Sequence, residues 1–434
     1  MKPLFAISCP IDTYSGYGSR SRDLVKAIIE LDKYDVKILP QRWGNTPWNF
    51  IEDHKEQWGF LKNHLLGQPQ LPKQPEIWAQ VTVPNEFQPV GKYNIGFTAG
   101  IETTLCAPEW IDGVNRMNVT YVSSNHAKKV FEESSFEQKD QQTNQVQRIV
   151  KLEKPVEVLF EGANTDVYKP IETKEVVDID LSHIKEDFAY IFVGHWLQGD
   201  IGEDRKNVGL LIKAFYETFK NKMKKPALIL KTSIGGTSYM DREEILKRIA
   251  SIRQMVNSVN VPNVYLLHGE FSDGEINQLY NHPKVKAMVN LTKGEGFGRP
   301  LLEFSLIKKP ILTSNWSGHT DYLDTDFVPL IGGEVKPVHA SAVVPNMILA
   351  ESSWFSPDPA YVGHYLKDVF ENYKKYTENA KRQAYKSKNE FSFDKMKEKL
   401  DELLTKHVPE FPKEIKLQLP QLKKIELPKL KKLQ

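Results

Sequence analysis

The sequence predicts an α/β protein built from two Rossmann-like, doubly wound domains that face a central cleft, followed by a helical C-terminal segment. Short apolar runs rich in β-branched residues alternate with helical patterns in both halves of the chain, as is typical of parallel sheets covered by helices. At 434 residues the chain is too long for one ordinary core and suits two domains of roughly 200 residues each. Such folds bind ligands at the carboxyl ends of their strands, so we expect the site in the cleft.

The spacing of apolar residues predicts the strands and helices of each half. In the first half, strands are expected at 4–8, 76–83, 94–99, 119–123 and 156–160, and helices at 19–31, 108–117 and 127–133. In the second half, strands are expected at 188–195, 227–233, 263–269, 285–291 and 310–314, and helices at 207–220, 241–257, 272–280 and 299–308. The repetition of one alternation indicates two domains of the same architecture.

These elements divide the chain into five parts. We expect an N-terminal Rossmann-like domain at 1–165 and a second one at 187–380, joined by a polar, proline-containing linker at 166–186. Helices at 381–410 are expected to cross back to the first domain. Residues 411–434 form a basic Leu/Pro/Lys tail, whose prolines exclude one long helix. The tail is interpreted either as a solvated end or as a contact for a protein or an anionic membrane surface.

The composition is that of a globular protein, with 40% hydrophobic and 26% charged residues. A formal net charge of +2 provides no global basic field, which disfavours nucleic acid as a partner. Cys9 and Cys106 are too few for a disulfide framework or a zinc site. No apolar stretch approaches the roughly 20 residues that span a bilayer. We therefore expect a cytoplasmic protein, with peripheral membrane contact through the tail as an open alternative.

The most informative motif is "KGEGFGRPLLE", which follows the strand predicted at 285–291. Pro300 stands where a helix would begin, a position that tolerates its missing N–H, and free amides at a helix start favour anions. Glu295 lies in the loop and Glu303 about one turn into the helix, so the two carboxylates can reach opposite ends of one ligand. Two carboxylates beside a phosphate site suit hydroxyls on both sides of a diphosphate, as in a nucleotide sugar.

At this motif the sequence resembles the family-4 retaining glycosyltransferases of GT-B fold. Their signature, Glu, seven residues and Glu within a pattern close to "EGFGxPLLE", reads "EGFGRPLLE" here. The resemblance also covers "PILTSNWSGHTDYL", "RKNVGLLIKAF", "LILKTS", "VTYVSSNHAKKVF" and "ANTDVYKP", in the right order. It implies that the first domain faces the acceptor and that the second binds the nucleotide sugar.

The resemblance also implies roles for individual residues. Glu303 would accept hydrogen bonds from the donor ribose, and Glu295 would lie beside the transferred sugar. Arg205 and Lys206 would neutralise the leaving diphosphate, with Lys231 as a weaker third candidate. Backbone amides near the sugar and phosphates would come from the segment Phe297, Gly298, Arg299, Pro300 and Leu301.

Cofactors and metals are not expected. The sequences "DID" at 178–180 and "DTD" at 324–326 mimic a metal-binding acid pair, but the first lies in the linker and neither follows a suitable strand. We interpret both as accidental. The partners implied are a nucleotide-diphosphate sugar and a hydroxyl acceptor, such as a glycan, a lipid-linked glycan or another polymer.

Departures from the family pattern concern the first domain. Its loop often reads Gly-Gly, whereas here Tyr17 separates Gly16 from Gly18. Many members place a histidine near the transferred sugar, and His126 is the nearest candidate. Glu102, in a loop after a strand, is a candidate for facing the acceptor.

The acceptor itself is not specified by the sequence. Residues 41–60 contain three tryptophans, which could stack on sugar rings or fill an apolar flap. The two interpretations have equal support.

Other functions fit less well. A nicotinamide dehydrogenase would use Gly16 and Gly18, but Ser21 replaces the third glycine of that fingerprint. A nucleotide-sugar epimerase of the same fold remains an alternative. A non-catalytic module that binds a sugar nucleotide or a glycan is the alternative from another class, and the joint presence of Glu295, Glu303, Arg205 and Lys206 disfavours it.

Overall fold

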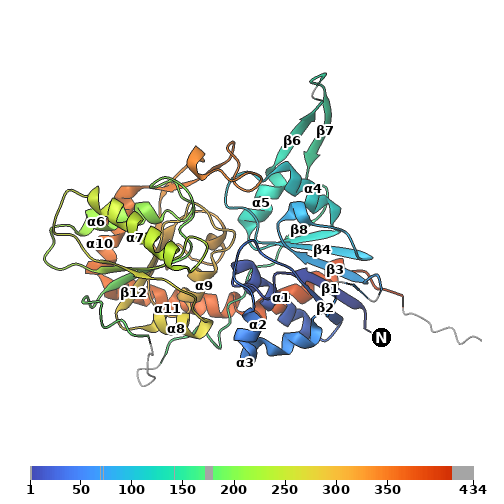
Figure 1. The fold of residues 1–434 in the computed structure, drawn as a ribbon, viewed down its shortest axis with the longest axis horizontal. Helices are drawn as coiled ribbons and strands as arrows, with labels where there is room; N and C mark the ends of the chain where they lie inside the picture. The colour runs from blue at the N-terminus through green and yellow to red at the C-terminus, as the bar shows by residue number, and fades with distance from the viewer. Residues whose placement is uncertain (1, 69, 72, 141, 172–178, 413–434) are drawn as a thin grey trace, which may run out of the picture.

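The computed structural model describes residues 2–68, 70–71, 73–140, 142–171 and 179–412, which form two α/β domains side by side (Figure 1). Almost all of the tail predicted at 411–434 lies outside the described residues, and so does the centre of the linker predicted at 166–186. In the described part of the chain, no helix has the length and apolar character needed to cross a membrane.

The first domain is built on a parallel sheet whose order is β2-β1-β3-β4-β5-β8 over the described residues. The strands are β1 (Leu4–Cys9), β2 (Asp35–Pro40), β3 (Ile77–Val81), β4 (Tyr93–Thr98), β5 (Val119–Val122) and β8 (Val156–Val158). Its helices include α1 (Gly16–Glu30), α2 (Phe50–Asp53), α3 (Lys55–Trp58), α4 (Pro108–Arg116) and α5 (Asn125–Glu133). All of β1 is buried, since a strand paired on both sides and covered on both faces must be apolar along its length.

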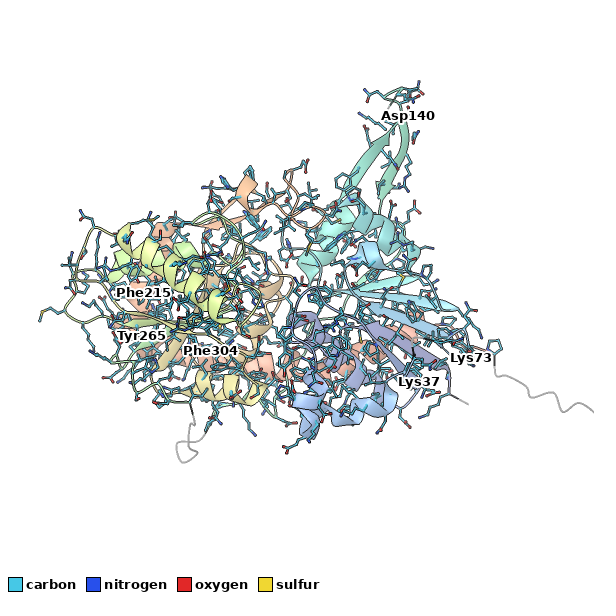
Figure 2. The ribbon with its side chains drawn as sticks, in the orientation of Figure 1. Lys37, Lys73, Asp140, Phe215, Tyr265 and Phe304 are labelled. Atoms are coloured by element: carbon cyan, nitrogen blue, oxygen red, sulfur yellow. The ribbon has the colours of Figure 1, made fainter. Side chains whose placement is uncertain are left out.

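The second domain repeats this plan with the order β11-β10-β9-β12-β13-β14. The strands are β9 (Ala189–Val193), β10 (Ala227–Lys231), β11 (Val264–Leu267), β12 (Val285–Asn290), β13 (Ile311–Ser314) and β14 (Leu330–Ile331). Its helices include α6 (Val208–Phe219), α7 (Tyr239–Gln254), α8 (Asp273–Asn281) and α9 (Arg299–Ser305). Figure 2 labels Phe215 of α6 and Phe304 of α9, which are both fully buried. The prediction of two Rossmann-like domains with a helical C-terminal segment is confirmed.

The C-terminal helices connect the second domain to the first. They are α10 (Pro359–Glu371), α11 (Tyr373–Glu390) and α12 (Phe393–His407). On α12, Met396, Leu400 and Leu404 join the apolar core of the first domain, and Lys397 Nζ lies 2.6 Å from Glu30 Oε2 on α1. The boundary expected at 380/381 falls inside α11, so one continuous helix leads out of the second domain.

Several elements are absent from the sequence prediction, among them the short helices α2 and α3, the two-residue strand β14 and the three features described next. The edge strand β2 lacks the pattern of a core strand because it is partly charged, only partly buried and ends in a proline. The hairpin of β6 (Ser135–Lys139) and β7 (Val146–Lys151) projects from the first domain, with Asp140 near its tip (Figure 2). The third is the antiparallel pair β15 (Gly333–Pro337) and β16 (Ser353–Pro357). β6, β7 and β15 carry few or no buried apolar residues, so their sequences lack the pattern of core strands.

Candidate functional site

A pocket of about 190 Å³ lies between the two domains, beyond the carboxyl ends of strands from both sheets. The first domain contributes residues after β1, β4 and β8, and the second contributes the glycine-rich loop after β12. Its lining residues include the predicted Gly16, Glu102, Arg205, Glu295, Phe297, Gly298 and Arg299. The structure therefore gathers predicted residues from four distant segments at the position expected for a doubly wound fold.

The glycine-rich loop packs directly on the backbone of the first domain. A Cβ atom at Gly294 would lie 1.9 Å from the carbonyl oxygen of Glu102, and one at Gly296 would lie 2.6 Å from that of Ala99. Any side chain at either position would force the domains apart. These two glycines therefore serve the contact between the domains, whereas Gly298 is needed for its positive φ of 88° before α9.

Glu295 is held by two cations that come from the loop before α6. Lys206 Nζ lies 2.5 Å from Glu295 Oε1, and Arg205 Nη1 lies 3.5 Å from Oε2. Burial alone would raise the pKa of Glu295, but the charges of Lys206 and Arg205 outweigh it and lower the pKa to about 2. The carboxylate is only 5% exposed, so the site keeps a buried negative charge beside two positive ones.

Backbone contacts fix the two cations in place. Lys293 donates its backbone N–H to the carbonyl of Arg205 at 2.7 Å, and the Arg205 guanidinium donates to the carbonyl of Gly294 at 2.8 Å. Arg205 Nη1 also lies 3.6 Å from Glu102 Oε1 of the first domain. The loop before α6 is thus tied to the glycine-rich loop. Arg205 lines the pocket, whereas Lys206 does not line it and pairs with the pocket residue Glu295.

Glu303 is the second carboxylate of the motif, and its neighbour is Arg299. Arg299 Nε donates to Glu303 Oε1 at 2.8 Å, while Nη1 of the same guanidinium donates to Asp23 Oδ2 of α1 at 2.6 Å. Burial raises the pKa of Glu303 to about 8, because desolvation and the nearby charge of Asp273 outweigh the attraction of Arg299. Glu303 does not line the pocket itself and lies behind Arg299.

The two glycines of the first-domain loop have different environments. A Cβ at Gly16 would meet open space, whereas one at Gly18 would lie 2.4 Å from the carbonyl oxygen of Thr13. Gly16 therefore faces the pocket and Gly18 packs inside the domain. Tyr17 separates the two glycines. Its hydroxyl forms a hydrogen bond with Thr98 Oγ1 at 3.0 Å, and it accepts the backbone N–H of Ala99 at 3.0 Å.

Four further predicted residues do not line the pocket. Lys231 Nζ donates to the carbonyl of Gly269 at 2.8 Å. Pro300 has no N–H, and Leu301 donates its N–H to the carbonyl of Gly298 at 2.9 Å while its side chain is buried in the core. His126 packs edge-on against Trp316 with ring centroids 4.6 Å apart, and burial lowers its pKa to about 4.

Sequence reasoning missed several pocket residues. Tyr17, Arg20 and Glu161 line the pocket, and only their positions after strands β1 and β8 could have indicated them. His195 does not line the pocket, but it lies two residues after the end of β9, the strand that pairs with both β10 and β12. Desolvation and the charges of Lys206 and Arg205 lower the pKa of His195 to about 4, so the neutral imidazole lies near the two cations.

The tryptophans of the segment at 41–60 have different environments. Trp58 is buried in the core of the first domain. Trp43 is partly exposed and stacks on Tyr17, with ring centroids 3.9 Å apart. One tryptophan therefore fills the core, while another lies beside a residue of the pocket.

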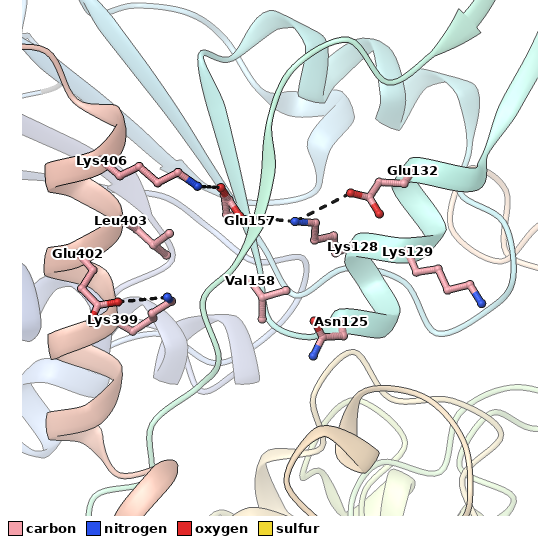
Figure 3. Close-up of a pocket in the computed structure, with 10 residues that line it drawn as sticks. All are labelled: Asn125, Lys128, Lys129, Glu132, Glu157, Val158, Lys399, Glu402, Leu403 and Lys406. Atoms are coloured by element: carbon pink, nitrogen blue, oxygen red, sulfur yellow. Dashed lines mark hydrogen bonds and ion pairs between the residues drawn. The ribbon is translucent and has the colours of Figure 1, made fainter.

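A second hollow of about 470 Å³ lies between α5 and α12 of the first domain, beside Glu157 and Val158 of β8 (Figure 3). None of the predicted site residues lines it. Its lysines are matched by carboxylates, with Lys406 and Lys128 both paired with Glu157. In the described ranges, no group of three or more His, Cys, Asp or Glu side chains is arranged to hold a metal ion.

Solved structures with the same architecture identify the fold as GT-B. HepE of Anabaena, crystallised with UDP and glucose, has 13% identity and a TM-score of 0.57, with 93% of this chain and 100% of that chain covered. Sucrose-phosphate synthase of Thermosynechococcus elongatus has 10% identity and a TM-score of 0.58, and the alignment covers 94% of this chain and 99% of that chain. A glycosyltransferase of Rickettsia africae has 13% identity and a TM-score of 0.55, and the alignment covers 93% of this chain and 98% of that chain.

Identities at this level establish the shared fold alone. No protein-family profile matches the chain, and no curated protein matches it in sequence.

Proposed function

We propose that the protein is a retaining glycosyltransferase of the family-4 type, which transfers a sugar from a nucleotide-diphosphate donor to a hydroxyl acceptor. The observation that carries the proposal is the convergence of Lys206 and Arg205 on Glu295 at the cleft between two Rossmann-like domains. The names of the structural neighbours support it, since they include glycosyltransferases and a protein crystallised with UDP-glucose.

Arg205 and Lys206 would stabilise the leaving diphosphate. As the bond between the anomeric carbon and the phosphate oxygen breaks, negative charge grows on the diphosphate. A guanidinium and an ammonium already fixed by the loop before α6 meet that charge without reorganisation, and a site shielded from water strengthens the effect. His195 and Gly16 lie near the same region and are further candidates for contact with the phosphates.

Glu295 would lie beside the transferred sugar. Its low pKa keeps it ionised, so its negative charge is present when positive charge develops at the anomeric carbon. Glu303 would accept hydrogen bonds from the ribose hydroxyls, at the far end of the donor from the reacting bond. Glu102 and Tyr17 of the first domain border the same pocket, which supports a role for them on the acceptor side.

The direct test is a donor panel. Purified protein would be incubated with UDP-, GDP-, ADP- and TDP-linked sugars, beginning with UDP-glucose, and products would be followed by mass spectrometry. Release of one nucleoside diphosphate, and transfer of the sugar once an acceptor is added, are expected. Conversion of the donor to an isomeric sugar without acceptor would instead identify an epimerase, and binding of every donor without turnover would identify a non-catalytic module.

A further inference from the structure

A buried ion cluster joins the two domains at Arg299. Its guanidinium belongs to α9 of the second domain, and Nη1 reaches Asp23 Oδ2 of α1 at 2.6 Å and Glu161 Oε2 at 3.9 Å. Nε donates to Glu303 Oε1 at 2.8 Å. The side chains of Asp23, Glu161 and Glu303 are each less than a tenth exposed. One arginine therefore contacts buried carboxylates of both domains.

The charges of this cluster make Arg299 difficult to replace. Arg20 lies nearby, but its guanidinium donates to the backbone carbonyls of Phe160 and Leu159, at 2.9 and 2.6 Å. Direct hydrogen bonds to Asp23 and Glu303 come from Arg299. Loss of one partner from a buried ion pair leaves an uncompensated charge, which is strongly unfavourable unless water reaches it. Water can reach this cluster if the two domains separate.

The geometry also restricts which residue type at position 299 can bind Asp23 and Glu303 at the same time. The fork of a guanidinium can bind one carboxylate through Nε and another through Nη1, whereas a lysine ammonium acts as a single point charge on a flexible stem. The contact through Nε engages Oε1 of Glu303 and so restrains the orientation of its carboxyl group.

We propose that Arg299 is a positioning residue that couples donor binding to domain closure, by holding Glu303 for the ribose hydroxyls and Asp23 of the opposite domain with the same guanidinium. The role of Glu303 rests on the proposed function, whereas the link between domains rests on the ion cluster alone. When a ribose binds at Glu303, it meets a carboxylate that is already oriented by the closed arrangement. Opening of the domains releases Asp23 and weakens that orientation.

Three variants distinguish the contact of Arg299 with Glu303 from its contact with Asp23. Arg299→Leu removes both contacts, Arg299→Lys retains the charge but not the fork, and Asp23→Asn removes the charge across the domains while Glu303 keeps its partner. The matched control is Asp321→Asn. Asp321 of the second domain accepts the backbone N–H of Asn125 of the first at 2.8 Å, so it crosses the same junction without contacting Arg299 or Glu303.

The first measurement is small-angle X-ray scattering of the variants without ligand, with folding checked by circular dichroism. Arg299→Leu and Asp23→Asn are expected to have a larger radius of gyration than wild type, while Asp321→Asn matches wild type. This result requires no donor, so it tests the link between domains even if the proposed function is wrong. Unchanged scattering for both Arg299→Leu and Asp23→Asn would overturn the proposal.

The second measurement is calorimetric titration with UDP, GDP, ADP and TDP, using the one that wild type binds most tightly. Affinity is expected to fall by about 10-fold or more for Arg299→Leu, the order expected for a hydrogen bond to a charged group, and less for Asp23→Asn. The Arg299→Leu and Asp23→Asn effects should not add in the double variant. With the matching donor, KM should rise more than kcat falls.

Additive effects of the two substitutions, or an affinity loss equal to that of Asp321→Asn, would contradict the coupling. Failure of wild type to bind any of the four nucleotides would count against the proposed function instead.

Discussion

Lys206 Nζ lies 2.5 Å from Glu295 Oε1, and both side chains are at least nine-tenths buried at the cleft between the domains. A buried ion pair is costly to desolvate and is weak evidence for stability. Its position therefore favours a functional reason for keeping the two charges together. In the proposed reaction, the ammonium meets the leaving diphosphate and the carboxylate faces the sugar that loses it.

The pH dependence of stability should report the burial of Glu303. Its pKa in the folded protein is about 8, above the usual 4.5. Between pH 4.5 and pH 8, the carboxyl group is therefore protonated in the folded state and ionised in the unfolded state. Stability should then fall as the pH rises through this window, by at most about 1.4 kcal/mol per pH unit.

Thermal melts of wild type and Glu303→Gln between pH 5 and pH 9 check this expectation. The variant cannot ionise at this position, so its stability relative to wild type should increase by up to about 2 kcal/mol between pH 6 and pH 8. Glu295 acts in the opposite sense, because its pKa of about 2 lies below 4.5; its stabilisation is present above pH 4.5 and is lost as the pH falls toward 2. Parallel melting curves for the two proteins would show that Glu303 is ionised throughout.

Metal independence is the second prediction. If Arg205 and Lys206 meet the diphosphate charge, a metal ion is not needed to neutralise it. Turnover with the matching donor should remain within about twofold when EDTA is added, which corresponds to less than about 0.5 kcal/mol. A loss of activity in EDTA that manganese or magnesium restores would show that the cations are insufficient.

The basic tail provides the third prediction. Residues 413–434 carry seven lysines and two glutamates and lie beyond α12. Their removal should leave the melting temperature and transfer to a small, water-soluble acceptor unchanged. Comparing vesicles of anionic and neutral lipid by sedimentation would test the surface contact, with loss of binding to anionic vesicles expected on truncation. Unfolding of the truncated protein would show that the tail belongs to a core.

The sequence predicts the core strands well because strands buried on both faces are continuously apolar, as in β1 and β9. It misses β2 and the β6–β7 hairpin, since an edge strand and an exposed hairpin need no such pattern. The resemblance predicts that Arg205, Lys206 and Glu295 all serve one donor, but it does not predict the direct ion pairs between Glu295 and the two cations.

The contacts that side chains make between the two domains are not predicted by the sequence. The Arg299 side chain reaches the other domain, which depends on how α9 and α1 pack and leaves no signal in the motif. Gly294 and Gly296 have the composition of a ligand-binding loop, yet their small size serves a contact between backbones. Both cases depend on the relative placement of the domains, which local sequence patterns do not encode.

The central claim is that Glu295 faces the reacting sugar while Glu303 holds the distant ribose. Measured above pH 8, where Glu303 is ionised, Glu303→Gln should mainly raise donor KM, by about 10- to 150-fold, the equivalent of a hydrogen bond to a charged group. Arg205→Ala and Lys206→Ala should resemble Glu295→Gln, because charge on the leaving group and on the anomeric carbon develops together on the way to the transition state.

The most direct test measures kcat and donor KM for Glu295→Gln and Glu303→Gln at a pH where both variants are folded by thermal melts. We predict that Glu295→Gln lowers kcat by about 10²- to 10³-fold, which is the scale of removing one electrostatic interaction from a transition state, with a smaller change in donor KM. A Glu295→Gln variant that turns over like wild type, together with a Glu303→Gln variant that is inactive at saturating donor, would contradict the account.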